Sequence, residues 1–230
     1  KRLNETMLQN LIHDLNEIKK EALADKNEAQ ATQCDALLKT IDDFENTAYL
    51  IEEYNISFSH MNLKSSAKNL SALYSKKIES MNRLLNKVSS TNFNQDVKKT
   101  IIKILLDTIN QGIKAPLNKN QKKTLTFLKT DLEALQNFYT NVDATINNQK
   151  LTIEAKKKEF KSAQATLEKT IKANQKKGFL NSGFRWQRIK LENTMLKAAQ
   201  KLVTQAQEKI GLTTKPINFN PKPQIQKRSS

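Results

Sequence analysis

The sequence is poor in the residues that interrupt helices. Its 230 residues include only four glycines and four prolines, which is far below average usage. Sandwiches, barrels and doubly wound α/β sheets need more turn residues than this chain supplies. Neither glycine nor proline occurs within residues 1–111 or 117–177. These absences exclude a turn-rich sheet protein and predict an all-α fold of long helices.

The residues that most often carry chemistry are also scarce. The single cysteine, Cys34, excludes an internal disulfide. The two histidines, His13 and His60, have no second histidine or cysteine at metal-ligand spacing, and no glycine-rich phosphate-binding motif occurs. Apolar runs are far shorter than the ~20 residues of a membrane-spanning helix. We therefore expect no catalytic residues, no cofactor, no metal site and no enzymatic activity.

Apolar residues recur every three or four positions along most of the chain, which is the spacing of one helix face. On this pattern we predict about five helices, at residues 1–53, 57–88, 95–111, 120–177 and 184–210. Helix 1–53 includes a phase shift at 24–33, which we interpret as a stutter rather than an end.

Several residues are expected to mark helix ends. Gly112, Gly178 and Gly211 each follow an apolar-periodic stretch, where the residue after a helix needs a positive φ. Asn94 and Asp96 suit the N-cap and first turn of the third helix.

The strongest periodic signal lies between residues 120 and 177. We expect a coiled-coil seam that continues through Gln149 and Lys156, two polar positions able to fix its register. Its apolar members are Leu125, Leu128, Leu132, Leu135, Tyr139, Val142 and Ile146. The helices can form an elongated antiparallel bundle, or the 121–176 seam can form a homodimer, and the sequence leaves both open.

These helices make one elongated domain, residues 1–212. Residues 213–230 contain three prolines and basic side chains but no acidic one. We expect this tail to be extended and disordered.

Charge is distributed unevenly. Residues 1–55 carry 6 basic and 12 acidic side chains, whereas residues 56–230 carry 33 basic and 11 acidic ones. A basic field of this kind attracts acidic proteins, anionic membranes or nucleic acids, and the alternative is a merely solvated lysine-rich surface. The candidate residues for binding an anionic partner are Lys156, Lys157, Lys158, Lys161, Lys172, Lys176, Lys177, Arg185, Arg188 and Lys190.

Four large apolar residues lie among these cations, namely Phe179, Leu180, Phe184 and Trp186. Such a mixture can insert at a bilayer interface or stack on bases. The alternative is that the aromatic residues close the end of the bundle. We favour this second interpretation, with Trp186 directed into the core.

The seam at 121–174 and the proline-containing tail at 216–223 also suggest a family. In these features the chain resembles the coiled-coil effectors that Legionella-type intracellular bacteria secrete into host cells, including an actin-nucleating effector that associates with endosomes. The resemblance implies a virulence role in the host cytoplasm. It also implies a host target such as actin filaments, an endosomal phosphoinositide membrane or a trafficking protein. It assigns no functional residue.

The leading hypothesis is a non-enzymatic binding or scaffold module that docks an acidic surface, with the actin filament as the first choice. One alternative is a BAR-like peripheral module that binds anionic or phosphoinositide membranes. A second is an adaptor to a host trafficking protein. For nucleic acids we expect only weak, sequence-independent binding that is sensitive to salt.

Overall fold

The computed structural model describes residues 3–58, 63–91, 93–177 and 183–213. Over these residues the chain forms seven α-helices and no strand, so the predicted all-α class is confirmed. The predicted tail lies outside this part of the chain from residue 214 onward. The helices are α1 (Leu3–Ala24), α2 (Glu28–Phe58), α3 (Leu63–Ser89), α4 (Gln95–Lys114), α5 (Lys119–Asn147), α6 (Ile153–Lys177) and α7 (Arg185–Thr213).

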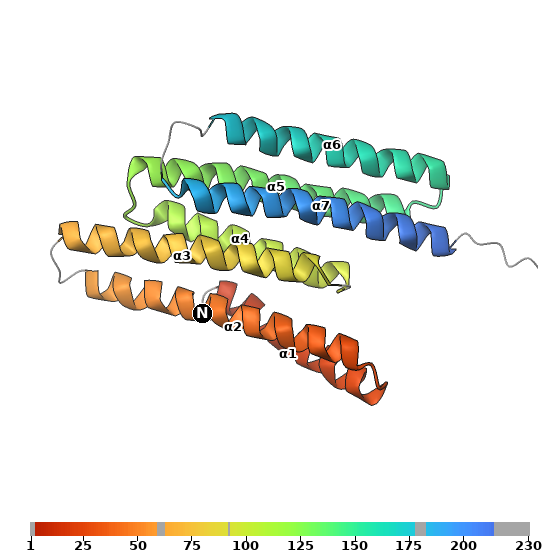
Figure 1. The fold of residues 1–230 in the computed structure, drawn as a ribbon, viewed down its shortest axis with the longest axis horizontal. Coiled ribbons are helices and arrows are strands. Elements are labelled where there is room, and N and C mark those ends of the chain that lie inside the picture. The colour runs from red at the N-terminus through yellow and green to blue at the C-terminus, as the bar shows by residue number, and fades with distance from the viewer. Residues whose placement is uncertain (1–2, 59–62, 92, 178–182, 214–230) are drawn as a thin grey trace, which may run out of the picture.

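The helices lie along one long axis and form successive layers (Figure 1). Helices α1 and α2 form a hairpin on one side, which among the described helices contacts only α3 and α4. Helices α5 and α7 follow, and α6 lies outermost against these two. The chain reverses direction so that α3, α5 and α7 all begin at the same end of the molecule (Figure 1).

The prediction of one helix over residues 1–53 is wrong, because the chain reverses at residues 25–27. Lys26 adopts a left-handed φ of 56°. The Asn27 N–H donates to the Ala22 oxygen at 2.7 Å, and the Lys26 N–H donates to the Leu23 oxygen at 3.2 Å. This pair of bonds is a Schellman motif, which ends a helix. Asn27 Oδ1 then accepts from the Gln30 N–H at 3.2 Å and caps α2.

The predicted helix 120–177 is also two helices, α5 and α6. Its seam therefore does not continue through Gln149, which is exposed in the connection. Thr152 Oγ1 accepts from the Ala155 N–H at 3.2 Å and caps α6. Lys156, expected to fix the register of a coiled coil, instead donates from Nζ to the Ile146 oxygen near the end of α5, at 2.8 Å. Its charge suits that site because helix C-termini are partly negative.

Two of the three predicted helix-ending glycines do not end helices. Gly112 lies inside α4 and Gly211 inside α7, and none of the described glycines has a positive φ. Gly178 lies outside the described residues. At Gly112 a Cβ atom would be 2.8 Å from Leu125 Cδ1 and 3.0 Å from Tyr74 Cε1. The missing side chain therefore permits close packing of α4 against α3 and α5.

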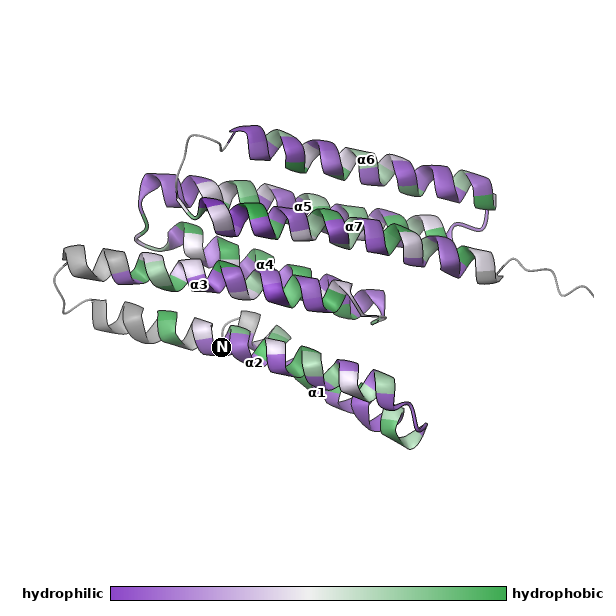
Figure 2. Ribbon diagram, in the orientation of Figure 1, coloured by the Kyte–Doolittle hydropathy of each residue, from purple (hydrophilic) through white to green (hydrophobic). Residues whose placement is uncertain are grey.

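Buried apolar side chains from all seven helices form one core. The short helix α4 packs against α1, α3 and α5, and its Ile101, Ile102, Ile104 and Leu105 are all fully buried. The predicted cap of α4 is confirmed, as Asn94 Oδ1 accepts from the Val97 N–H at 3.0 Å. Figure 2 shows that most of the outermost helix, α6, is hydrophilic.

The predicted seam lies within this core rather than on a free face. Its residues from Leu125 to Val142 are at most 1% exposed in the single chain, and Ile146 is partly buried. The apolar side chains expected at a dimer interface are thus covered by the chain's own helices. Cys34, on the core side of α2, is also fully buried.

Candidate anion-binding end of the bundle

Several stretches of the described chain contain no acidic residue, and the fold gathers three of them at one end. They are residues 69–78 in α3, residues 108–130 around the α4–α5 connection, and residues 169–191 from α6 to α7, of which 178–182 are not described. Because α3, α5 and α7 begin at the same end, these stretches lie together (Figure 1). We call their described residues the basic end.

Polar contacts join the three stretches. Gln121 Nε2 on α5 donates to Ser71 Oγ on α3 at 2.6 Å. Gln187 Nε2 on α7 donates to Ser75 Oγ, one turn further along α3, at 2.7 Å. These two parallel Gln–Ser pairs tie the beginnings of α5 and α7 to the same face of α3.

Gly183 adds a backbone contact to this junction. Its oxygen accepts from Thr124 Oγ1 at 2.6 Å, and a Cβ at this position would be 2.8 Å from the Gln121 backbone nitrogen. Glycine is therefore required here for close approach of the chain leading into α7. The basic end is held by specific packing and is not a loose meeting of loops.

Fourteen basic side chains belong to the basic end, and two of them, Lys77 and Arg188, are buried. The other twelve are exposed or half-exposed. They are Lys76, Lys114, Lys119, Lys122, Lys123, Lys129, Lys169, Lys172, Lys176, Lys177, Arg185 and Lys190. With no carboxylate in the same stretches, their fields add along this end of the molecule.

Four exposed acidic side chains lie at the other end of the molecule. Asp25 and Glu28 flank the α1–α2 turn, Asp96 begins α4 and Glu154 begins α6, all of them exposed. Figure 1 places these helix ends opposite the basic end. The end opposite the basic end thus mixes acidic side chains with lysines such as Lys26 and Lys157.

Trp186 is 71% exposed at the beginning of α7, so the favoured prediction that it enters the core is wrong. Its neighbour Phe184 occupies the buried position instead, with a φ of 54° that turns the chain into α7. The Arg185 guanidinium carbon lies 5.8 Å from the Trp186 ring centre. Phe179 and Leu180 lie outside the described residues.

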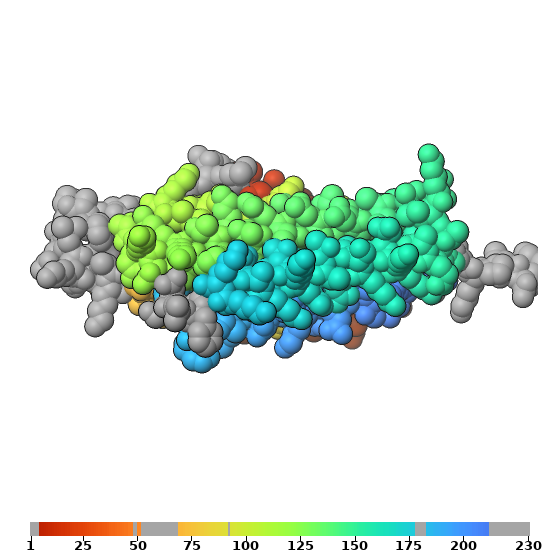
Figure 3. Space-filling model, turned by 90° about the horizontal axis from the view of Figure 1, so that it is seen from above, coloured from red at the N-terminus to blue at the C-terminus, as the bar shows by residue number. Residues whose placement is uncertain are grey.

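A shallow cleft of about 450 Å³ adjoins Trp186. Neutral amide and hydroxyl groups dominate its lining, including Ser71, Ser75 and Gln187, and Arg185 is its charged member. Figure 3 shows the first turns of α7 at the molecular surface beside the second half of α6. The indole is thus presented at the rim of an open, polar surface.

The predicted site residues fall into two groups that the structure does not bring together. Lys156, Lys157, Lys158 and Lys161 lie in the first half of α6, where Glu154 and Glu159 share the same turns. Lys157 Nζ pairs with Glu154 at 3.3 Å. Lys172, Lys176, Lys177, Arg185 and Lys190 belong to the basic end, with Lys172 Nζ 4.0 Å from Glu168.

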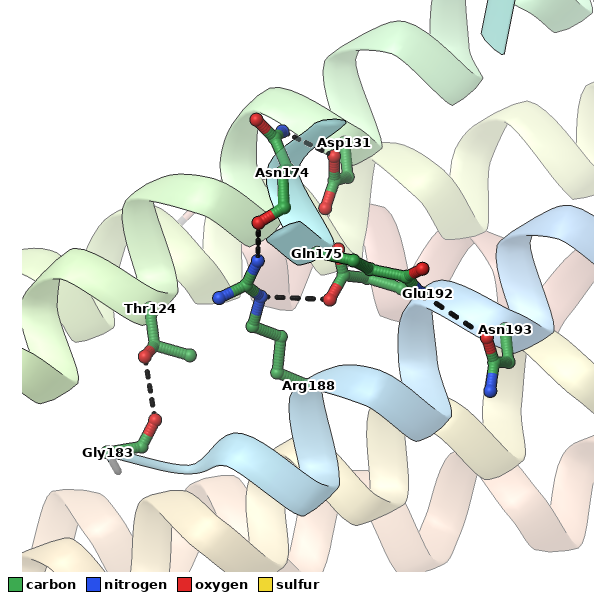
Figure 4. A network of polar contacts seen from close by, with 8 residues as sticks. All are labelled: Thr124, Asp131, Asn174, Gln175, Gly183, Arg188, Glu192 and Asn193. Carbon is green, nitrogen blue, oxygen red and sulfur yellow. Dashed lines mark hydrogen bonds and ion pairs between the residues drawn. The ribbon is translucent and has the colours of Figure 1, made fainter. Parts of the chain in front are cut away.

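Arg188 must be removed from the predicted binding residues, because it is only 3% exposed. Its Nε donates to Glu192 Oε1 at 2.8 Å, and its guanidinium also bonds the Asn174 backbone oxygen (Figure 4). The guanidinium carbon lies 4.6 Å from the Phe127 ring centre. The charge of Arg188 is used inside the bundle, where it joins α5, α6 and α7.

Two carboxyl groups complete this buried network. Asn174 Nδ2 donates to Asp131 Oδ1 at 2.6 Å (Figure 4). The carboxyl group of Glu192 also interacts with that of Asp131. No donor of the described residues reaches Asp131 Oδ2 or Glu192 Oε2. Burial, with the nearby Glu192, raises the pKa of Asp131 to about 9, and burial also raises the pKa of Glu192. One proton kept between the two acids satisfies both oxygens and leaves one carboxylate for Arg188.

The predicted binding residues did not include the lysines that flank the α4–α5 connection, among them Lys114, Lys119 and Lys123. A signal was present, because residues 108–130 lack acidic side chains just as residues 169–191 do. What the sequence did not provide was the proximity of these two stretches, since that depends on how the helices reverse.

Within the described part of the chain, no three His, Cys, Asp or Glu residues are grouped as metal ligands. None of the helices described is long and apolar enough to cross a membrane. The chain matches no protein-family model, no curated protein and no solved structure.

Proposed function

We propose that the chain is a non-enzymatic binding module that docks on an anionic macromolecular surface through its basic end. The observation that carries the proposal is the convergence of three acid-free stretches, distant in sequence, on one end of the bundle. Twelve exposed or half-exposed cations repel one another in the free protein, because their own stretches contain no carboxylate and Glu168 pairs with Lys172 alone at the edge. An anionic partner relieves that repulsion.

The composition of the basic end indicates the manner of binding. Eleven of these cations are lysines, and Arg185 is the exception. Lysine is a compact, strongly hydrated charge without the fixed fork that arginine offers to a carboxylate or phosphate. We therefore expect many weak contacts, fast association and steep loss of affinity with salt, because the Debye length falls to about 8 Å at physiological ionic strength.

Two partners of this kind follow from the sequence analysis. One is a strongly acidic protein assembly such as the actin filament, which the effector resemblance also implies. The other is an anionic membrane. Charge alone does not favour either partner, so the first experiment tests binding to both of them.

The experiment is co-sedimentation of the full chain with actin filaments and, separately, with anionic lipid vesicles at low and high salt. One variant replaces Lys119, Lys123, Lys176 and Lys177 with glutamine. A matched control replaces four exposed lysines outside the basic end, Lys20, Lys150, Lys158 and Lys201. Both variants lose the same net charge.

We expect the basic-end variant to lose most of its binding and the control to keep most of it. Equal loss in both variants would mean that only net charge matters, and would contradict the proposal. Absence of binding to either surface at low salt would contradict it as well.

A further inference from the structure

The exposed indole of Trp186 gives the basic end an apolar contact as well as a charged one. Of the large apolar side chains described, Trp186 is the most exposed, at 71%, and Leu23 and Leu50 follow at 53% and 49%. A soluble bundle normally buries so large a side chain, and the neighbouring Phe184 is buried. The structure therefore offers this ring to a partner.

The surroundings of Trp186 identify the chemistry of that partner. Lys176 and Lys177 end α6, and Arg185 and Lys190 flank the indole on α7. Figure 3 shows the beginning of α7 at the surface beside the second half of α6. Tryptophan prefers the boundary between water and lipid, because its ring is apolar and its N–H needs a polar partner. The lysines around it are attracted to anionic headgroups, and each such lysine increases the membrane affinity about fivefold.

Resting on the proposed function, we infer that the anionic surface is a lipid bilayer, into whose headgroup region Trp186 inserts while the surrounding lysines contact anionic lipids. The single projecting ring argues for a bilayer. A protein partner needs a pocket formed to receive the indole, whereas fluid lipid adapts to it. Binding of single-stranded nucleic acid uses several aromatic side chains on which successive bases stack, and the basic end exposes one.

Trp186 is the only tryptophan in the sequence, so tryptophan emission, excited selectively over the four tyrosines, reports on this site alone. The experiment adds vesicles of phosphatidylcholine, with or without phosphatidylserine, at low salt. With phosphatidylserine we expect the emission to shift to the blue and to be quenched by lipids that carry a quencher near the headgroup. With phosphatidylcholine alone we expect no change.

Two variants distinguish the contribution of Trp186 insertion from that of the surrounding charges. Trp186→Ala should reduce the affinity for phosphatidylserine vesicles about tenfold, the effect of losing one large aromatic contact, and should leave the helical circular dichroism unchanged. Leu23→Ala removes an exposed apolar side chain at the α1–α2 turn and is the matched control. It should bind as the parent does.

The outcomes distinguish this inference from the proposed function. If vesicles or actin filaments bind the basic end while the emission stays that of an indole in water, the inference is overturned and the proposed function stands. Quenching without a blue shift by single-stranded nucleic acid, with no response to vesicles, also overturns it. Lack of binding to any anionic surface would contradict both the inference and the proposed function.

Discussion

Asp131 on α5 and Glu192 on α7 place two carboxyl groups within hydrogen-bonding reach of each other in the core, beside the Arg188 guanidinium. Both acidic residues are fully buried. With both ionised, the cluster would hold one negative charge too many and two oxygens without a donor. A shared proton removes both problems, so the network stabilises the folded chain more at low pH than at high pH.

The contribution of Asp131 to stability should therefore fall as the pH rises. The unfolded chain releases the Asp131 proton near pH 4, whereas the folded chain keeps it until about pH 9. The stabilisation by this group is complete below pH 4 and is lost as the pH rises to 9, at no more than about 1.4 kcal/mol per pH unit. Urea unfolding of the parent at a series of pH values measures this slope.

Asp131→Asn is the isosteric test of the shared proton. An asparagine amide can donate to Glu192 Oε2 at any pH, so the variant should lose the part of the slope that Asp131 contributes. The difference between variant and parent is the informative quantity, since other groups titrate equally in both. A variant with the same slope as the parent would show that Asp131 is ionised in the folded chain.

Arg188→Gln should destabilise the protein strongly. It leaves the Glu192 carboxylate buried without its cation, a change that typically costs about 3–5 kcal/mol. Lys176→Gln, at an exposed position in the same basic end, should leave the urea midpoint essentially unchanged. An Arg188 variant as stable as the Lys176 variant would place the guanidinium in solvent and refute the network.

The contribution of Lys77 to stability should depend on pH in the opposite direction to that of Asp131. Burial lowers its pKa to about 7, and its Nζ donates to the Phe44 oxygen at 2.7 Å while lying 3.1 Å from the Phe44 ring centre. The folded chain thus loses stability as the pH falls from about 10.5 to 7. Lys77→Met should remove this loss and raise the stability measured at pH 6 relative to that at pH 10. An unchanged pH profile would contradict the low pKa.

The glycines of α4 and α7 should respond to alanine with opposite signs. Gly112→Ala inserts a methyl group against Leu125 and the Tyr74 ring, and overpacking of this kind costs about 1–3 kcal/mol. For Gly211→Ala, no atom beyond the local helix backbone lies within 4 Å of the new carbon, so the change should gain up to about 1 kcal/mol of helix propensity. Urea denaturation distinguishes the two signs, and a stabilising Gly112→Ala would show that α4 and α5 separate easily.

The sequence predicted the class and the core better than it predicted the helix ends. Spacing alone identified the buried side chains from Leu125 to Val142 and the Asn94 cap. The break at Lys26 was missed because a lysine takes the left-handed position that usually indicates glycine. Asn27 and Thr152 are common cap residues, but similar residues are frequent throughout this polar chain.

The candidate site was predicted only in part. Clusters of cations can be read directly from a sequence, whereas the meeting of residues 108–130 with residues 169–191 depends on three helix reversals. Arg188 and Trp186 lie two residues apart, yet the first is buried and the second exposed. Helical rotation by about 200° between them accounts for the difference, but the register that directs one inward is set by tertiary packing.

The reactivity of the single cysteine can report on opening of the α1–α2 hairpin. Cys34 is fully buried in the layer formed by α1 and α2, and burial raises the pKa of its thiol, so the folded chain offers a reagent little thiolate and no path to the sulfur. Modification must wait until α2 moves away from its neighbours. The rate at which a thiol reagent modifies Cys34 therefore reports how often that hairpin opens.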